Sequence, residues 1–350
     1  MRRLDFLVPH WHETPELMEP LLDSIKVQRV VDLSQVGVII AYDGPDASEL
    51  PLDEWRERYP FAIEDVHPDK GGVSHTRNAA LKASKAEYVI FTDADDCLMD
   101  NRGLFVVFRE MDADPNPVEM QKVNVPRSEW KKGFDFLLCD FVEETKTPDG
   151  RLDYVPHQNN STFVHSQVAR RQWLLDNDLL FADALTCHED SYWVIRCREI
   201  VKPWRGKLCQ FPWFLWAWNG ASTCRHSPDT YILSTMPNMI ESNAALVDDF
   251  IRRGMTDRAS TYFVMQVFDV YYMLNKPEWI RETNKDYRDR VERDFVAHFR
   301  AHYELWDDMP NQQKMMISQG VRQRSVMEGM LLEALTCQQW LNRILEKYPE

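Results

Sequence analysis

The sequence predicts an α/β protein with a mainly parallel, twisted sheet flanked by helices, followed by an all-helical extension. Short apolar runs at residues 4–8, 36–42, 61–66 and 88–92 are each followed by Pro, Asp or His, the pattern of buried strands that end in turns. Helical patterns separate the first run from the second and the third from the fourth. With right-handed crossovers, this order implies parallel strands.

The first helix is predicted between the first two runs. Thr14 is a typical N-cap and Pro15 suits the first helical position, after which apolar residues recur every four positions up to Ile25. Pro20 leaves open whether this helix is kinked or begins later. A second helix is predicted over residues 74–84, before the fourth run.

Beyond the fourth run the pattern is less regular. The sequence predicts a proline-bearing loop or small insertion at residues 112–132 and a strand at 134–142. Helices are predicted at 167–176 and 191–198, and an irregular tryptophan-rich stretch at 203–228. After about residue 230, apolar residues recur at helical spacing. We therefore predict two domains, an α/β domain at 1–230 and a helical extension at 231–350.

The charge distribution argues against a protein that wraps around a polyanion. The net charge is -15, and residues 231–350 carry 15 Lys and Arg against 18 Asp and Glu, so 12 of the 15 excess negative charges lie before residue 231. Affinity for duplex nucleic acid comes mainly from Lys and Arg that neutralise phosphates. An acidic front part fits an enzyme that gathers carboxylates around a cation.

The cysteines and apolar segments point to a reducing compartment. The seven cysteines form no Cys-x-x-Cys pair and are odd in number, which favours reduced thiols. No stretch reaches the roughly 20 apolar residues that a membrane span requires; the nearest, residues 259–274, contains Gln266 and Asp269. We expect a cytoplasmic protein, with peripheral membrane contact left open and the oligomeric state undecided.

Three aspartates follow the fourth apolar run. Asp93, Asp95 and Asp96 stand where a strand of the predicted sheet ends, and parallel sheets bind ligands beyond the carboxyl ends of their strands. Carboxylate oxygens are preferred ligands of Mg²⁺ and Mn²⁺. An isolated Asp-x-Asp is more often an acidic turn, so the surrounding motifs decide how it is interpreted.

Those motifs resemble family 2 glycosyltransferases. The similar segments, in chain order, are Phe6-Leu-Val-Pro9, Ala41-Tyr-Asp-Gly44, Lys70-Gly-Gly-Val-Ser-His-Thr-Arg-Asn-Ala-Ala-Leu81, Glu87-Tyr-Val-Ile-Phe-Thr-Asp-Ala-Asp-Asp96 and Glu189-Asp190. The resemblance covers roughly residues 4–225 and is strongest over 70–96. It implies a GT-A fold, with the first domain as the catalytic domain that binds a nucleotide-sugar, and inversion at the anomeric centre.

The resemblance also implies which residues hold the nucleotide-sugar donor. Tyr42 replaces the first aspartate of the family's Asp-Asp-Gly motif. Pro9 and His12 would line the nucleotide pocket, and Asp43 would meet the base. Gly71 would allow close backbone approach, Arg77 would contact the donor, and Asp93 would lie by the ribose or diphosphate.

The metal and the catalytic base are implied in the same way. Asp95 matches the principal ligand of Mn²⁺ or Mg²⁺, with Asp96 in support and His226 as a candidate additional ligand. Asp190 matches the carboxylate that deprotonates the acceptor hydroxyl. An aspartate at this position could equally cap the helix that follows, and the two roles are compatible.

Several functions remain open at this stage. The resemblance implies transfer from a UDP-sugar to a hydroxyl on a glycan, a lipid-linked saccharide or a protein. The alternatives are glycosylation of a hydroxymethylated base in DNA and a non-catalytic binding module derived from a glycosyltransferase. Acceptor contacts could come from His157, His165, Arg170 or Arg171, and sugar contacts from Trp213, Trp216 or Trp218, each of which could instead be a core residue.

Overall fold

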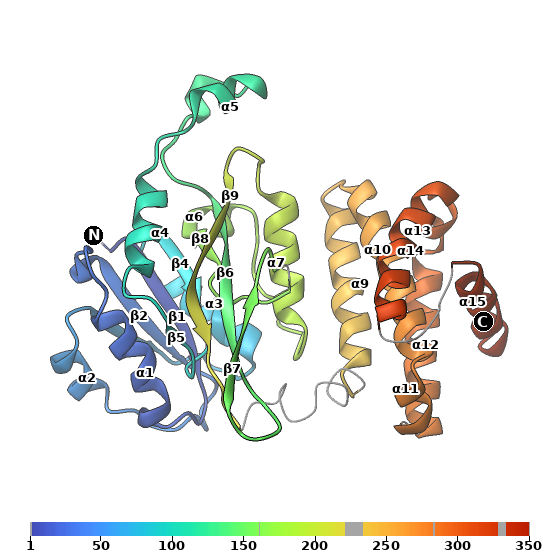
Figure 1. The fold of residues 1–350 in the computed structure, drawn as a ribbon, viewed down its shortest axis with the longest axis horizontal. Helices are drawn as coiled ribbons and strands as arrows, with labels where there is room; N and C mark the ends of the chain where they lie inside the picture. Colours follow the sequence, from blue (N-terminus) through green and yellow to red (C-terminus); the bar gives the residue numbers. More distant parts are fainter. Residues whose placement is uncertain (1, 161, 221–233, 283, 328–333, 350) are drawn as a thin grey trace. The chain divides into compact units, whose positions relative to one another are not determined.

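The computed structural model describes residues 2–160, 162–220, 234–282, 284–327 and 334–349. The chain forms two compact units, residues 1–219 and 220–350, here called unit 1 and unit 2. Unit 1 holds the sheet, and the described part of unit 2 is helical (Figure 1).

Unit 1 is built on one mixed sheet. Its strand order is β3-β2-β1-β4-β8-β6-β9-β5, with β7 paired to β6. The strands are β1 Leu4–His10, β2 Val36–Tyr42, β3 Ala62–Val66, β4 Tyr88–Phe91, β5 Cys97–Leu98, β6 Phe136–Lys146, β7 Leu152–His157, β8 Val168–Arg170 and β9 Gly206–Trp216. The first four are parallel, as predicted, whereas β8 runs antiparallel to both β4 and β6.

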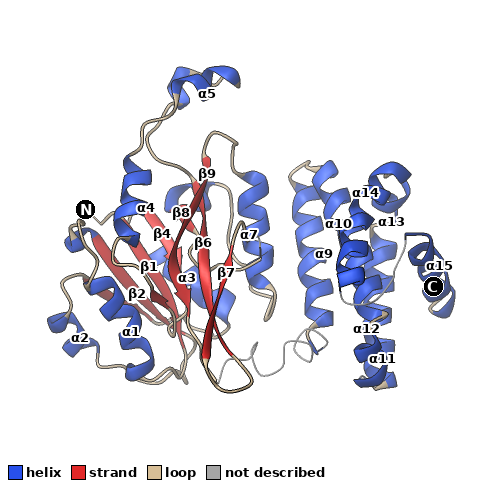
Figure 2. Cartoon of the chain, viewed as in Figure 1, coloured by secondary structure: helices blue, strands red, loops and turns tan. Residues whose placement is uncertain are grey.

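Helices cover both faces of this sheet (Figure 2). They are α1 Pro15–Lys26, α2 Leu52–Arg58, α3 Val73–Ala83, α4 Gly103–Asp112, α5 Pro117–Lys122, α6 Arg171–Asp176 and α7 Glu189–Ile200. Residues from α1, α2 and α4 share one core cluster with Phe6 of β1, and residues from α3, α6 and α7 share another with Leu7. Neighbouring residues of β1 thus face opposite cores, which is why its sequence is almost continuously apolar.

The helix predicted at residues 167–176 begins only at Arg171, because Val168–Arg170 form β8. Two prolines account for other points that the sequence left open or hid. α1 begins at Pro15 and continues through Pro20, so the second proline lies inside the helix. In the stretch predicted to be irregular, β9 forms with Pro212 next to the point where its register with β6 shifts, between Cys139 and Phe141. A proline cannot donate to a strand ladder and is tolerated at such a bulge, so its presence hid the strand.

Unit 2 is helical throughout its described residues, as predicted. Its helices are α9 Met236–Arg252, α10 Thr256–Leu274, α11 Pro277–Glu282, α12 Lys285–Ala301, α13 Tyr303–Asp307, α14 Asn311–Met327 and α15 Ala334–Lys347. α10 supplies the centre of the core. Phe263 stacks on Phe299 of α12 at 5.7 Å, and Tyr271 meets Trp340 of α15 at 5.4 Å between ring centroids.

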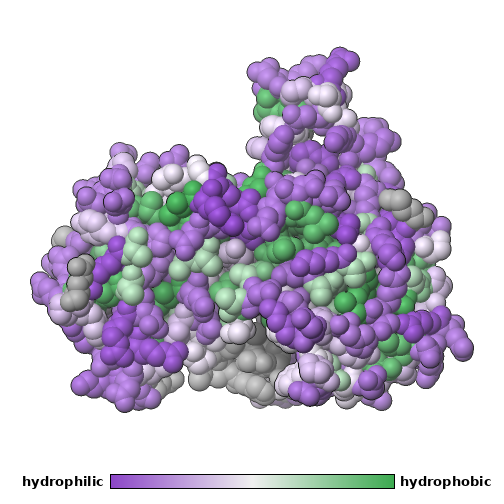
Figure 3. All heavy atoms as spheres, turned by 180° about the vertical axis from the view of Figure 1, so that it is seen from behind, coloured by the Kyte–Doolittle hydropathy of each residue, from purple (hydrophilic) through white to green (hydrophobic). Residues whose placement is uncertain are grey.

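The surface is mixed in character. Figure 3 shows hydrophilic residues interspersed with small apolar areas. Among the described residues, no helix has the length and apolar character needed to cross a membrane.

We predict that Gly133→Ala destabilises unit 1. Gly133 has φ +72°, and an added Cβ would clash with the Tyr88 hydroxyl and lie 2.7 Å from the Met111 carbonyl oxygen. The backbone strain and the clash together should lower the free energy of unfolding by about 2–4 kcal/mol, measurable by denaturant titration. Gly150→Ala is the matched control, because Gly150 also has positive φ but its nearest neighbour is Lys146 Cε at 3.8 Å. A loss no larger than that of the control, expected at about 1 kcal/mol, would contradict the prediction.

Candidate active site

The candidate site lies at the carboxyl edge of the parallel strands. β1, β2, β3 and β4 all end on this edge, where parallel sheets place their ligands. The loops after these strands carry the predicted residues His12, Asp43, Gly71, Asp93, Asp95 and Asp96, and Pro9 lies near the end of β1 itself. Arg77 reaches the same edge from α3 and Asp190 from α7.

Arg77 is the centre of the site. Its side chain is 3% exposed. One guanidinium nitrogen, Nη1, donates to Glu189 Oε1 at 2.8 Å and to Asp190 Oδ1 at 2.9 Å, and Nη2 donates to Asp93 Oδ1 at 2.9 Å. A buried arginine therefore joins the acidic loop after β4 to the start of α7, two segments almost a hundred residues apart in the chain.

The segment before α7 is fixed by polar contacts with α3. Asp183 accepts hydrogen bonds from His75 at 3.1 Å and from Asn78 at 3.2 Å, and the Ser74 hydroxyl donates to the Leu185 carbonyl at 3.0 Å. His188, directly before α7, has φ 60°, a left-handed conformation that costs energy for a residue other than glycine. The strained turn aims Glu189 and Asp190 at Arg77.

The carboxylates differ in their protonation behaviour. Burial raises the pKa of Asp190 to about 7, with Glu189 and Asp93 adding to the rise and Arg77 opposing it. Burial also acts on Asp93, but the positive charges of Arg77 and His165 outweigh it and lower the pKa of Asp93 below its usual value. The site thus pairs a carboxylate that stays ionised with one that titrates near neutral pH, an arrangement suited to a general base.

His165, expected only as a possible acceptor contact, lies beside the acidic triplet formed by Asp93, Asp95 and Asp96. β8 is antiparallel to β4, with Val168 opposite Ile90, so His165 comes beside the loop after β4. Its Nδ1 lies 3.2 Å from Asp96 Oδ2, and both side chains are buried. Burial raises the pKa of Asp96 to about 7 despite the opposing effect of His165, and the Asp96 charge raises the pKa of His165 against the effect of its burial.

These residues fit a divalent cation. One ligand atom from each of Asp93, Asp96 and His165 lies within 4.8 Å of the others. Although Asp96 Oδ2 and His165 Nδ1 are close, neither atom has a hydrogen bond of acceptable geometry among the described residues, as expected for atoms that could turn toward a metal. Asp95 lies beside this group, and its Oδ2 accepts a hydrogen bond from Asn219 at 2.8 Å. His226 lies outside the described residues.

The residues predicted for the nucleotide occupy the neighbouring loops. Asp43 accepts hydrogen bonds from the backbone N–H of Gly72 and, at 3.0 Å, from the Thr76 hydroxyl, so it holds the start of α3. Gly71 lies close to Asp43: a Cβ added at this glycine would be 3.1 Å from Asp43 Oδ1. Pro9 is half-buried at the end of β1, and His12 is exposed.

An aromatic group that sequence reasoning missed lines the same edge. Tyr42 stacks on His67 at 4.3 Å and meets the buried His10 edge-on at 5.1 Å. Each ring ends or follows a different strand, so only the strand pairing brings them together. A flat surface of this kind suits a nucleotide base.

The tryptophans and arginines left open by the sequence have distinct positions. Trp213 is fully buried in the core, whereas Trp216 stacks on His165 at 5.0 Å between ring centroids and lies beside the acidic triplet. Arg170 contacts Glu87 and the Tyr88 hydroxyl, and Arg171 donates to the Leu81 carbonyl at 3.1 Å. Both arginines lie by the start of β4, at the opposite end of that strand from the site.

Comparison with known proteins identifies the family. Residues 5–177 match the family model described as Glycosyl transferase family 2. The chain belongs to this family. The matched range includes the acidic triplet, Arg77 and His165, and it ends before Asp190, whose place in the site comes from the fold.

Two similar curated proteins are, by their names, a glycosyltransferase that acts on poly(ribitol-phosphate) and a protein of teichoic acid biosynthesis. The poly(ribitol-phosphate) beta-N-acetylglucosaminyltransferase TarS of Staphylococcus aureus is 23% identical over 203 residues, 56% of this chain and 32% of TarS. The minor teichoic acid biosynthesis protein GgaB of Bacillus subtilis is 30% identical over 97 residues, 27% of this chain and 11% of GgaB. The chain therefore spans about a third or less of the length of these relatives.

Solved structures confirm the predicted GT-A fold and the helical extension. Residues 1–349 of S. aureus TarS in complex with UDP-GlcNAc superpose with a TM-score of 0.60 at 13% identity, covering 94% of this chain and 92% of that one. A longer TarS structure superposes with a TM-score of 0.58 at 14% identity, covering 93% of this chain and 53% of that one.

We predict that Arg77→Gln lowers the free energy of unfolding by about 3–5 kcal/mol at pH 8, because it leaves three partly buried carboxylates without their cation. The loss should be smaller at pH 6. Burial raises the pKa of Asp190 to about 7, so at pH 6 most of this carboxyl is protonated and no longer carries the charge that Arg77 stabilises. Denaturant titration at both pH values measures the difference.

Removing one of the charges tests the physical cause of this effect. In the double variant Arg77→Gln/Asp190→Asn, one of the three carboxylates is neutral, so the protein should be more stable than Arg77→Gln alone. A double variant less stable than Arg77→Gln at pH 8 would show that geometry, and not charge, dominates.

Proposed function

We propose that the chain transfers a sugar from a UDP-sugar to an acceptor hydroxyl with inversion, using a divalent cation at the acidic triplet. The observation that carries the proposal is the bridge made by Arg77. In a family 2 glycosyltransferase domain, it links the carboxylates expected to meet the donor diphosphate to Asp190, the carboxylate expected to act as base.

Two lines support a UDP-sugar as the donor. TarS, which has the same fold, was solved with UDP-GlcNAc, and in this chain the loops that hold Asp43 and the Tyr42–His67 stack offer a polar group and a flat aromatic surface at the carboxyl edge of the sheet. We propose an N-acetylhexosamine as the sugar on the same basis. Gly71 keeps the loop beside Asp43 free of a side chain.

The cation would be Mn²⁺ or Mg²⁺, held by Asp93, Asp96 and His165 with Asp95 beside them. When bound, it supplies charge that neutralises the departing diphosphate. The protein itself keeps Asp93 ionised through Arg77, so the site carries negative charge for a cation at neutral pH. His165 stands between Asp96 and the ring of Trp216, which fixes its orientation.

Asp190 would take the proton of the acceptor hydroxyl. Inversion requires one carboxylate on the side of the anomeric carbon opposite the leaving diphosphate. The acceptor oxygen forms the new bond to that carbon as its proton passes to Asp190 and the bond to the diphosphate breaks. Hydrogen bonds from Arg77 to both Asp190 and Glu189 hold the base in place.

We predict that Asp190→Asn lowers kcat about 10²–10⁴-fold while leaving the Kd for UDP within about threefold, because only the base is removed. In the wild-type protein, kcat/KM should increase as the pH rises through about 7. Burial raises the pKa of Asp190 to about 7, and the base works only when it is deprotonated. Radiolabelled donor transfer and calorimetry measure the two quantities.

The matched control for this variant is Asp176→Asn, which removes an exposed carboxylate at the end of α6 and should leave kcat within about twofold. If Asp190→Asn retained the wild-type kcat, Asp190 would not be the base. Loss of UDP binding in that variant would instead indicate that Asp190 shapes the donor site.

We predict that EDTA abolishes transfer and that Mn²⁺ restores it. His165→Gln should raise the Kd of Mn²⁺ measured by electron paramagnetic resonance with UDP present by about 10–100-fold if the ligands are Asp93, Asp96 and His165. If Asp95 is instead the principal ligand, as the family resemblance implies, Asp95→Asn should raise the Kd of Mn²⁺ by a similar factor. Transfer that continues in EDTA would refute the metal requirement.

A further inference from the structure

Unit 2 contains a pocket that the proposed transfer does not use. The pocket has a volume of about 440 Å³ and is lined by residues from the end of α10, from α11, from α12 and from α15. This volume lies within the range typical of small-molecule sites. We call it the unit 2 pocket.

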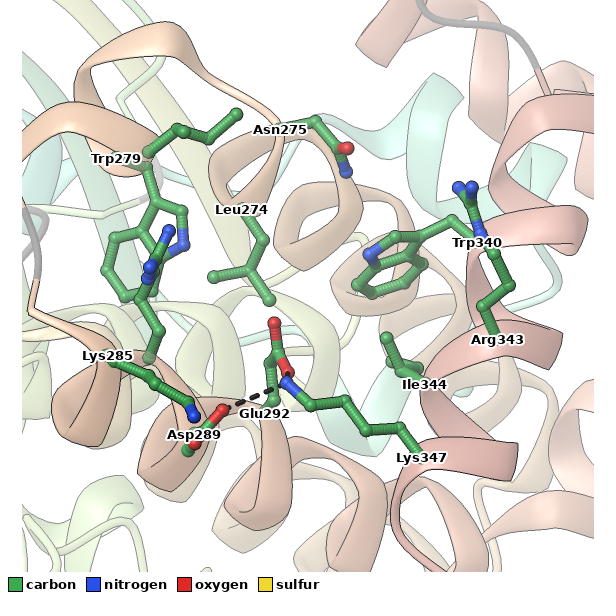
Figure 4. A pocket seen from close by; sticks show the side chains of 12 residues that line it. Leu274, Asn275, Trp279, Lys285, Asp289, Glu292, Trp340, Arg343, Ile344 and Lys347 are labelled. Carbon is green, nitrogen blue, oxygen red and sulfur yellow. Dashed lines mark hydrogen bonds and ion pairs between the residues drawn. The ribbon is translucent and has the colours of Figure 1, made fainter.

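The walls of the pocket are aromatic and apolar. Figure 4 shows Trp279 and Trp340 on opposite sides, with Leu274 between them. The indole nitrogen of Trp340 points toward the middle of the pocket in Figure 4, and no acceptor for it is found in the part of the chain that the structure describes. A polyhydroxylated molecule could place its C–H groups against these rings and a hydroxyl near the indole N–H.

The rim of the pocket is cationic, in a chain of net charge -15. Lys285, Arg288 and Arg343 line it, and none of the three has an acidic partner within ion-pairing distance among the described residues. Unpaired guanidinium groups match the geometry of phosphate oxygens. Three such cations around one pocket of an acidic protein favour an anionic ligand.

The two carboxylates of the pocket are already engaged at one end. Lys347 donates to Asp289 at 2.9 Å and to Glu292 at 2.6 Å, and the Tyr348 hydroxyl donates to the same two side chains at 3.0 and 2.8 Å. These contacts dock α15 on α12. Their remaining lone pairs can accept hydrogen bonds from ligand hydroxyls, while the opposing cations stay available for a phosphate.

We propose that the unit 2 pocket binds a phosphorylated polyol or sugar unit, with the phosphate at the cationic rim and the hydroxylated body between the two indoles. This chemistry uses all three features of the pocket: apolar walls, carboxylate acceptors and unpaired cations. The inference goes beyond the proposed function and does not depend on it, because binding is measured without a donor.

The test is a methyl NMR titration of the full chain, labelled at isoleucine, with ribitol 5-phosphate at low salt. Ile280 and Ile344 line the pocket, whereas Ile40 and Ile90 lie in the sheet of unit 1. The methyl signals of Ile280 and Ile344 should shift with saturation, and those of Ile40 and Ile90 should not. Absence of any shift at Ile280 and Ile344 would overturn the proposal.

The same titration measures the separate contributions of the polyol, of the phosphate and of the two arginines. Ribitol alone and inorganic phosphate alone should each bind at least about tenfold more weakly than ribitol 5-phosphate, because each lacks one set of contacts. The variant Arg288→Gln/Arg343→Gln should weaken binding by about tenfold or more. Arg290→Gln/Arg293→Gln is the matched control, because it also removes two positive charges and both arginines lie on α12 without lining the pocket.

Three outcomes would refute the assignment. Inorganic phosphate that binds as tightly as ribitol 5-phosphate would reveal a general anion site, and ribitol that binds as tightly would reveal a neutral polyol site. Equal weakening by Arg288→Gln/Arg343→Gln and by Arg290→Gln/Arg293→Gln would show that net charge, and not the pocket, governs affinity. Failure of sugar transfer would leave these binding results unchanged.

Discussion

The buried contact between Arg77 and three carboxylates is the constraint on which the site depends. Taking an arginine and carboxylates out of water is costly unless each charge is paired, so Asp93, Glu189 and Asp190 must converge on one guanidinium. This requirement fixes the loop after β4 relative to the start of α7. It also sets the protonation behaviour, since the same charge keeps Asp93 ionised while burial brings the pKa of Asp190 to about 7.

The change of strand direction in the sheet adds the second half of the site. The parallel strands bring their loops to one edge, and β8 then enters antiparallel beside β4. An antiparallel neighbour presents the residues that precede it at the edge where β4 ends. His165 and the ring stack with Trp216 reach the acidic triplet for this reason. The parallel half and the antiparallel strand thus make separate contributions to one cluster.

Local patterns in the sequence predicted the strands β1 to β4, the helical extension and the acidic residues, because each depends on spacing within a few residues. His165 could not be predicted, since its position follows from the pairing of β8 with β4. Arg77 was expected to contact the donor, but its contact with α7 could not be predicted, because Glu189 is 112 residues away in the chain. The strand β9 was hidden by Pro212, whose tolerance depends on a bulge that only the sheet reveals.

Asn219 has a consequence for communication along the chain. It is the last residue of unit 1, and its side chain donates to Asp95, while the backbone N–H of Ala217 donates to Asp96. The last residues of unit 1 are therefore hydrogen-bonded to the acidic triplet. A ligand that displaces Asn219 from Asp95 changes the free energy with which the end of unit 1 is held at the site. By thermodynamic reciprocity, any change that displaces Asn219 also changes the affinity of the acidic triplet for that ligand.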